Sequence, residues 1–228
     1  NVTVNPLPVP TIGGPASVCL NSTGNVYTTQ PGMTNYTWVV PVGGTITAGG
    51  TATDNTVTVT WTETGVKTIT VVYTNGNGCT NSVPATYNVT VHPLPIPTIT
   101  GPDPACASST GNVYTTESGM TNYLWTVSAG GTITAGGGAG DNTVSVTWNT
   151  PGPQSVSVNY TNGNLCTAAA PTVLPVTVNP LPTATISGTT AVCRYAPQPN
   201  TVRSEYSEVV ASGAGQPTPT RTPTPTAS

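Results

Sequence analysis

Five cysteines are the residues of this chain whose type and spacing could do chemistry, and that chemistry would be disulfide formation. Cys19, Cys106 and Cys193 follow one another at intervals of 87 residues, and the same interval separates Cys79 from Cys166. Cysteines that recur at one fixed interval indicate a repeated domain. Because paired cysteines persist in oxidising compartments, the series predicts a secreted, extracellular or cell-surface protein.

The spacing allows two pairings, and sequence alone does not decide between them. Within repeats, Cys19 pairs with Cys79 and Cys106 with Cys166, and Cys193 stays unpaired or forms an intermolecular bond. Between repeats, Cys79 pairs with Cys106 and Cys166 with Cys193, and Cys19 is left over. We favour the first pairing, because a self-contained repeat is the simpler unit.

Other reactive side chains are sparse, and we expect no catalytic residue, no metal ligand and no cofactor. The single histidine, His92, stands beside a proline-rich joint, and no C-x-x-C motif is present. No Ser/His/Asp or Cys/His set can be assembled. Asp54 and Asp141 occupy the same position of the repeat, in the sequence "DNT", where capping a turn is favoured over binding calcium. The sequence therefore predicts a protein that is not an enzyme.

Tryptophans are the candidates for a ligand-binding surface. Trp38 and Trp125 each follow a tyrosine by two residues, so alternation places them with that tyrosine on the core face of a strand. Trp61 and Trp148 stand at strand ends, and these two are our candidate ligand aromatics.

Candidate glycosylation sites occur at both ends of the chain. Asn21 lies in an N-x-S/T sequon within a predicted loop. A Pro/Thr-rich stretch near the C-terminus is typical of O-glycosylated stalks. Its candidate acceptors are Thr218, Thr220, Thr222 and Thr224.

Composition excludes two classes of partner. Only 5% of the 228 residues are charged, and the formal net charge is −3. Four Lys and Arg residues cannot form the basic stripe that nucleic acid requires, so no nucleic-acid partner is expected. No apolar run reaches the length of a membrane span.

The abundant Val, Thr, Ile and Tyr favour β-strands. Short alternating segments separated by turn signals fill each copy of the repeat. In "TVTVTW", residues 56–61, the valines and the tryptophan point one way and the threonines the other. "KTITVVYT" and "ATYNVTV" alternate in the same way, and "NGNGC" between them is a turn. Several such strands in 87 residues predict an antiparallel β-sandwich.

The interval divides the chain into five parts. Residues 6–92 and 93–179 are the two complete repeats, and residues 1–5 match the closing strand of a preceding repeat or serve as a donor strand. Residues 180–212 are a partial third repeat followed by a divergent segment, and residues 213–228 are a Pro/Thr-rich tail. The joints "HPLPIP" and "NPLPTA" carry alternate prolines, which favour an extended path.

The order of motifs "PxPTIxGPxxxC", "VYTT", "Y-x-W", "GGTIT", "DNTVxVTW", "V-x-Y-T-N-x-N-x-C" and "VTV-x-PLP" resembles the PKD-like, immunoglobulin-like repeats of bacterial secreted and cell-surface proteins. The resemblance covers about residues 6–193, although the chain lacks a turn like "W-x-F-G-D-G". It implies an all-β fold of tandem immunoglobulin-like (PKD-like) antiparallel β-sandwiches. It also implies a stalk, spacer, adhesin or filament module.

These observations lead to two functional hypotheses. The first is an extracellular structural repeat protein, a stalk or a self-assembling surface filament subunit joined by terminal strand exchange. Its partner would be a second copy, arranged head to tail, or neighbouring repeats of a longer chain. The alternative is a carbohydrate-binding or adhesin module of a larger secreted protein, with glycans as its partners.

Overall fold

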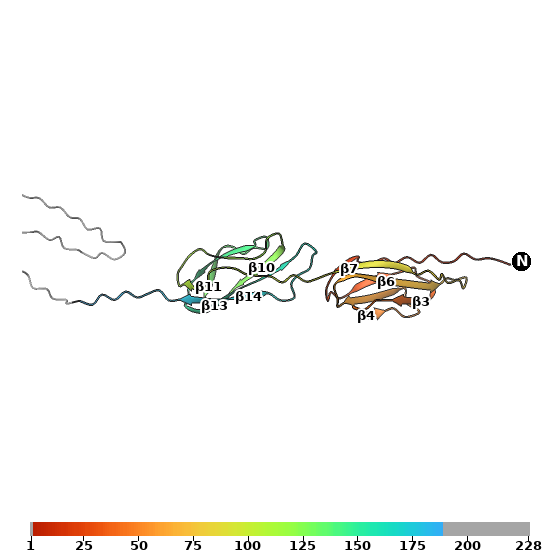
Figure 1. Cartoon of the computed structure of the whole chain (residues 1–228), viewed down its shortest axis with the longest axis horizontal. Helices are drawn as coiled ribbons and strands as arrows, with labels where there is room; N and C mark the ends of the chain where they lie inside the picture. Colours follow the sequence, from red (N-terminus) through yellow and green to blue (C-terminus); the bar gives the residue numbers. More distant parts are fainter. Residues whose placement is uncertain (1, 189–228) are drawn as a thin grey trace, which may run out of the picture. The chain divides into compact units, whose positions relative to one another are not determined.

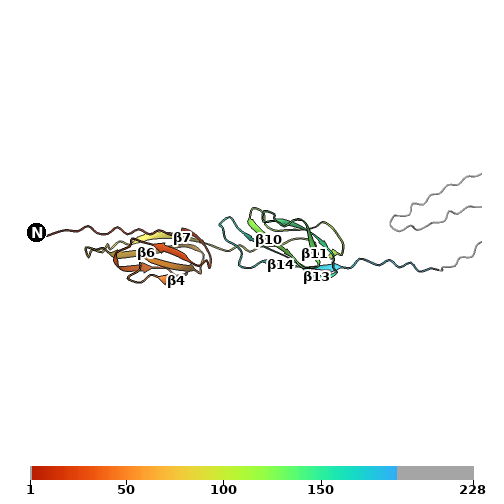
Figure 2. The same ribbon diagram turned by 180° about the vertical axis from the view of Figure 1, so that it is seen from behind.

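The computed structural model describes residues 2–188, and within them the chain forms two successive sets of β-strands (Figures 1 and 2). Both sets belong to one compact unit, Asn1–Pro182. No helix in the described part is long and apolar enough to cross a membrane. The prediction of an all-β chain built from two repeated sandwiches is confirmed.

Repeat 1 is a sandwich of two sheets, with strand order β1-β7-β6-β3 in one and β2-β5-β4 in the other. Its neighbouring strands are antiparallel except for β1, which runs parallel to β7. The strands are β1 (Ser17–Cys19), β2 (Asn25–Thr28), β3 (Thr34–Val39), β4 (Gly44–Gly49), β5 (Thr56–Trp61), β6 (Gly65–Thr74) and β7 (Ala85–His92).

Repeat 2 has the same two sheets, β8-β14-β13-β10 and β9-β12-β11. Here the short β8 runs parallel to β14, as β1 does to β7. The strands are β8 (Ala105–Cys106), β9 (Asn112–Thr115), β10 (Thr121–Val127), β11 (Gly131–Gly136), β12 (Thr143–Trp148), β13 (Gly152–Thr161) and β14 (Thr172–Asn179).

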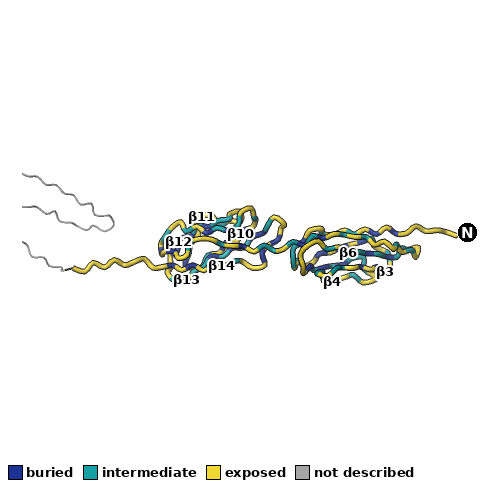
Figure 3. Tube along the Cα trace, in the orientation of Figure 1, coloured by how far each residue is buried: buried dark blue, intermediate teal, exposed yellow. Residues whose placement is uncertain are grey.

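Each core follows from the alternation of side chains along the central strands. In β5, Val57, Val59 and Trp61 are buried, and the threonines between them lie on the opposite, partly exposed face. Strands β6 and β7 bury their own alternate residues against these, among them Ile69 and Val89. Buried stretches alternate with less buried ones along the strands of both repeats (Figure 3). Both repeats therefore fill the space between their sheets with valine, tyrosine and tryptophan.

A bulge interrupts the pairing of β3 with β6, where the register shifts between Thr34 and Thr37. Asn35 lies in the bulge with a φ of 53°, in the left-handed region that asparagine tolerates better than most residues. Asn122 in β10 has the same φ at the equivalent position. The two repeats thus share their irregular backbone as well as their regular strands.

Candidate functional site

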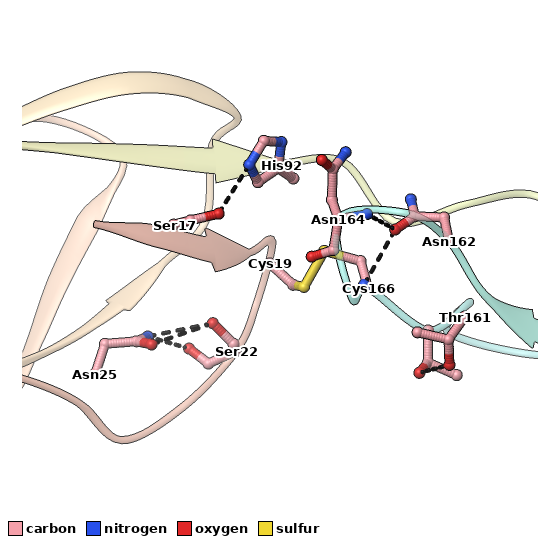
Figure 4. The surroundings of a disulfide bond; sticks show 10 residues. Ser17, Cys19, Ser22, Asn25, His92, Thr161, Asn162, Asn164 and Cys166 are labelled. Carbon is pink, nitrogen blue, oxygen red and sulfur yellow. Dashed lines mark hydrogen bonds between the residues drawn. A yellow bond between two sulfur atoms is a disulfide. The ribbon is translucent and has the colours of Figure 1, made fainter. Parts of the chain in front are cut away.

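A disulfide bond joins the two repeats, and its surroundings are the candidate functional site (Figure 4). The bond links Cys19 of repeat 1 to Cys166 of repeat 2, with Cα atoms 5.5 Å apart and a sequence separation of 147 residues. A covalent bond between domains fixes which surfaces face each other. The joint between the repeats is therefore tied by the bond as well as by residues 93–99, which lie in no strand.

Cys19 is held at the C-terminal end of repeat 1, the end at which β7 finishes. It is the last residue of β1 and stands opposite His92, the last residue of β7. The backbone N–H of Leu20 donates to the carbonyl of His92 at 2.9 Å, and Ser17 Oγ lies 3.0 Å from His92 Nε2 (Figure 4). The side chain of Asn25 anchors the following turn by donating to the carbonyls of Ser22 and Val59. Cys19 is thus presented on a braced turn.

Cys166 is held at the N-terminal end of repeat 2, in the turn that precedes β14. The Oδ1 atom of Asn162 accepts hydrogen bonds from the backbone N–H groups of Asn164 at 3.0 Å and Cys166 at 3.1 Å (Figure 4). The N–H of Asn162 in turn donates to the carbonyl of Cys166 at 2.9 Å. Asparagine side chains stabilise turns in this way, so the turn "NGNLC" is built to hold its cysteine in place.

The pairing of Cys19 with Cys166 follows neither expected arrangement of the disulfides. Cys19 stands at the end of β7, whereas Cys79 lies in the turn before β7 begins. An eight-residue strand is about 23 Å long from first to last Cα, and bonded cysteines need Cα atoms within about 7 Å. The preferred bond within repeat 1 is therefore ruled out by the length of the sandwich.

The same geometry applies to the other expected bonds. Cys106 stands opposite Asn179 at the end of β14, whereas Cys166 precedes that strand, so these two cysteines are also a strand length apart. In the described residues Cys79 and Cys106 carry no disulfide, and Cys79 is partly exposed and Cys106 exposed. Cys193 lies outside the described residues.

Trp61 and Trp148 are not surface residues, so our choice of them as ligand aromatics is wrong. Both side chains are 0% exposed. The indole N–H of Trp61 donates to Tyr27 Oη at 3.1 Å, and that of Trp148 donates to Tyr114 Oη at 3.0 Å. The alternation along β5 already places Trp61 with Val57 and Val59, and this signal outweighs its position at a strand end. Trp38 and Trp125 lie in the cores as predicted.

Asp54 and Asp141 cap turns, as their sequence context predicts. Asp54 Oδ2 accepts the N–H of Thr51 at 3.0 Å, and Asp141 Oδ2 accepts that of Gly138 at 2.9 Å. Hydrogen bonds from the hydroxyl and the N–H of Thr51 lower the pKa of Asp54. Within residues 2–188 no three histidine, cysteine or acidic side chains form a group able to hold a metal ion.

The candidate glycosylation sites have different outcomes. Asn21 is exposed in the turn after β1, with a φ of 61°, two residues beyond the bonded Cys19. Thr218, Thr220, Thr222 and Thr224 lie outside the described residues. Glycosylation at any of these residues stays a prediction.

Two tandem sandwiches joined by a proline-rich segment and a disulfide define a modular all-β protein. A family model described as "PKD-like domain" matches residues 5–89 and again residues 92–176. The two matches cover most of the chain, which therefore belongs to the PKD-like domain family. The predicted resemblance is thereby confirmed, and no catalytic domain is identified among these matches.

The solved structures that match this chain have low sequence identity to it and low TM-scores. They include the fibronectin(III)-like modules of Clostridium thermocellum CbhA (14% identity, TM-score 0.34, 75% of this chain and 95% of that one). Domains 4 and 5 of the S-layer protein SbsC match at 16% identity and TM-score 0.32, over 76% of this chain and 98% of that one. The D00-D0 domain of intimin matches at 15% identity and TM-score 0.36, over 74% of this chain and 96% of that one. No curated protein matches the sequence. The family assignment therefore depends on the sequence matches of the two repeats.

Proposed function

We propose that this chain is a structural spacer of an extracellular or cell-surface protein, without catalytic activity, whose task is to carry tension. Its units are the repeats 6–92 and 93–179. The observation that carries the proposal is the bond between Cys19 and Cys166. It lies at the joint of the repeats, where it strengthens the link between them.

The bond offers force a route that bypasses most strands of both sandwiches. Tension applied to the two ends of the chain passes through residues 1–19, across the disulfide to Cys166, and onward. Most strands of both sandwiches lie between Cys19 and Cys166 in sequence and are thereby kept out of that route. A stalk gains from this arrangement, because tension cannot extend the protected segment while the bond is intact.

The low charge and the disulfide support a location outside the cytoplasm. The partly exposed threonine face of β5 supports the same location, since it provides a neutral, hydrogen-bonding surface. Neighbouring repeats of a longer chain are the partners that this function requires.

Single-molecule pulling of the full chain from its two ends tests the proposal. With the disulfide intact, the segment between Cys19 and Cys166 should add no length. Reductant should release an additional extension of up to about 500 Å, the length of 147 extended residues. A Cys19→Ser, Cys166→Ser double variant should give the long extension without reductant. Equal extensions for the native and double-variant chains would contradict the proposal.

We also propose a self-assembling form of this function, which the sequence of residues 1–5 supports. "NVTVN" resembles residues 88–92, which lie in β7, so residues 1–5 of one copy could act as a closing strand for another. β7 and β14 already fill that position in the described repeats, so the incoming strand would have to displace one of them. Electron microscopy of the native chain should show filaments that disappear when residues 1–5 are deleted. Filaments that persist after the deletion would contradict strand exchange.

A further inference from the structure

Each described repeat carries one cysteine at each end, and the Cys19–Cys166 bond uses only half of them. Cys19 and Cys106 stand at the C-terminal ends of their sandwiches, opposite the last residues of β7 and β14. Cys79 and Cys166 stand in the turns at the N-terminal ends. The bond joins a C-terminal-end cysteine to the N-terminal-end cysteine of the next repeat. Cys106 and Cys79 occupy the equivalent positions, at the C-terminal end of repeat 2 and the N-terminal end of repeat 1, and form no disulfide in the described residues.

Cys79 is held as Cys166 is. Asn75 Oδ1 accepts the N–H groups of Asn77 and Cys79, each at 3.0 Å, as Asn162 does for its own turn. The Sγ atom of Cys79 lies 3.8 Å from the carbonyl oxygen of Asn77, and that of Cys166 lies 3.7 Å from the carbonyl oxygen of Asn164. The N-terminal end of repeat 1 therefore presents its thiol in the geometry that is bonded in repeat 2.

Cys106 is held as Cys19 is. The N–H of Ala107 donates to the carbonyl of Asn179 at 2.8 Å, matching the bond from Leu20 to His92. The N–H of Ser109 donates to the carbonyl of Cys106 at 3.1 Å, matching the bond from Ser22 to Cys19 at 3.0 Å. Cys106 is exposed, so a partner thiol has access to it. Both halves of a second joint are thus prepared by the fold.

We propose that copies of this chain are joined head to tail by a disulfide between Cys106 of one copy and Cys79 of the next. The inference extends the proposed spacer function, because the new joint repeats the one between repeats 1 and 2. The oxidant is a low-molecular-weight disulfide. The Cys106 thiolate attacks one of its sulfurs and expels a thiolate, and the Cys79 thiolate of the second copy then displaces the other. Two protein thiols become one disulfide, and the small disulfide is reduced to two thiols.

The contact that forms in this way is heterologous, because the two surfaces that meet are different. A growing chain of copies keeps a free Cys79 at one end and a free Cys106 at the other. Addition of copies therefore continues as an open chain. The partner that fits both ends is a second copy, since Cys106 and Cys79 are the repeat equivalents of the bonded Cys19 and Cys166, each displaced by 87 residues.

The test is oxidation of the full chain by a mixture of reduced and oxidised glutathione, followed by non-reducing electrophoresis and mapping of disulfide-linked peptides. The protein concentration is about 1 mM. Cysteines within one chain meet at an effective concentration of that order, so bonds between chains form efficiently only when the protein itself is this concentrated. A Cys193→Ser background removes the fifth cysteine. If the proposed joint forms, electrophoresis should show a ladder of multimers, and the mapped peptides should link Cys79 to Cys106.

Two variants in that background distinguish the proposed joint from other bonds. Cys79→Ser and Cys106→Ser should each stay monomeric alone, and an equal mixture of them should give dimers and no longer species. Dimers from either variant alone would overturn the proposal, because they require a bond other than the one between Cys79 and Cys106. Monomers in the mixture, or a monomer whose Cys79 and Cys106 thiols are bonded to each other, would overturn it as well.

The same peptide map separates this inference from the spacer function. A Cys19–Cys166 bond without any Cys79–Cys106 link would overturn the joint between copies and leave the spacer standing. Loss of the Cys19–Cys166 bond itself, with the ladder still formed by Cys79 and Cys106, would contradict the spacer function while supporting the joint.

Discussion

Trp61 and Tyr27 hold each other in the centre of repeat 1. The indole N–H of Trp61 donates to Tyr27 Oη at 3.1 Å, the rings meet edge to face with centroids 6.3 Å apart, and both side chains are 0% exposed. Trp148 and Tyr114 repeat the arrangement at 3.0 Å and 6.3 Å. The pair joins β5 to β2 through a polar contact inside an apolar core.

Replacing Tyr27 with Phe should destabilise repeat 1 by about 1–3 kcal/mol, because the buried indole N–H of Trp61 loses its acceptor. Hydrogen exchange read by mass spectrometry resolves peptides of each repeat and measures the loss locally. Repeat 2 serves as the internal control, and Tyr114→Phe should reverse the pattern. Unchanged protection in repeat 1 would show that the hydrogen bond contributes nothing to stability.

The sequence predicted the cores of both repeats well, because they depend on local alternation. Val57, Val59 and Trp61 share a face of β5 for the simple reason that side chains alternate along a strand. Trp61 was misplaced only where its position at a strand end was given more weight than this alternation. The alternation was the better guide, because the sandwich still covers β5 at its last residue.

Gly44 gives a second prediction, because the Trp61 ring fills the space beside it. A Cβ atom at Gly44 would lie 2.6 Å from Cζ3 of Trp61 and 2.5 Å from Cγ1 of Val40. Gly44→Ala should therefore destabilise repeat 1 by about 1–3 kcal/mol through overpacking, measured by urea denaturation. Gly76→Ala is the matched control, since nothing lies within 4 Å of its Cβ position. A loss of stability in both variants would point to backbone effects and not to the tryptophan.

Asn35 gives a third prediction, which concerns the bulge in β3. Its φ of 53° is tolerated by asparagine and glycine but strains a β-branched residue. Asn35→Val should cost about 1–2 kcal/mol of unfolding free energy, whereas Asn35→Gly should cost less, because glycine adopts this φ without strain. Asn122→Val should have the same effect in repeat 2. If valine and glycine gave equal stabilities, the left-handed backbone would not be the cause.

The disulfide could not be predicted from spacing, because it depends on strand order. The interval of 87 residues identifies equivalent cysteines but not the end of the sandwich at which each lies. That position is set by β1, a strand of three residues that runs parallel to the distant β7 and takes Cys19 to the C-terminal end. A short parallel strand leaves almost no pattern in a sequence, so the pairing with Cys166 became visible only in the fold.

A carboxylate, that of Glu117, holds the segment that leads into repeat 2 by hydrogen bonds, and the side-chain amide of Gln30 does the same for the segment that leads into repeat 1. Glu117 accepts hydrogen bonds from the N–H and hydroxyl of Thr98 and, at 2.7 Å, from the hydroxyl of Thr116. At the equivalent place in repeat 1, Gln30 Oε1 accepts the N–H of Thr11 at 3.1 Å. Partial burial by itself would raise the pKa of Glu117, but these hydrogen bonds outweigh it and lower the pKa to about 2.

Protonation of Glu117 in acid should therefore weaken its hydrogen bonds to Thr98 and destabilise this part of repeat 2. A carboxyl group with a pKa of about 2 in the folded chain and an ordinary value of 4.5 stabilises the fold fully above pH 4.5, and the stabilisation is lost as the pH falls toward 2. For a partly exposed group, solvent screening reduces the effect to about 1 kcal/mol. Protection of peptides around Thr98, taken relative to the intrinsic amide exchange rate at each pH, should fall in the native chain as the pH drops from 4.5 toward 2, and Glu117→Gln should remove this pH dependence of protection. The reverse change, Gln30→Glu, should introduce it around Thr11, and a native pH profile identical to that of Glu117→Gln would refute the assignment to Glu117.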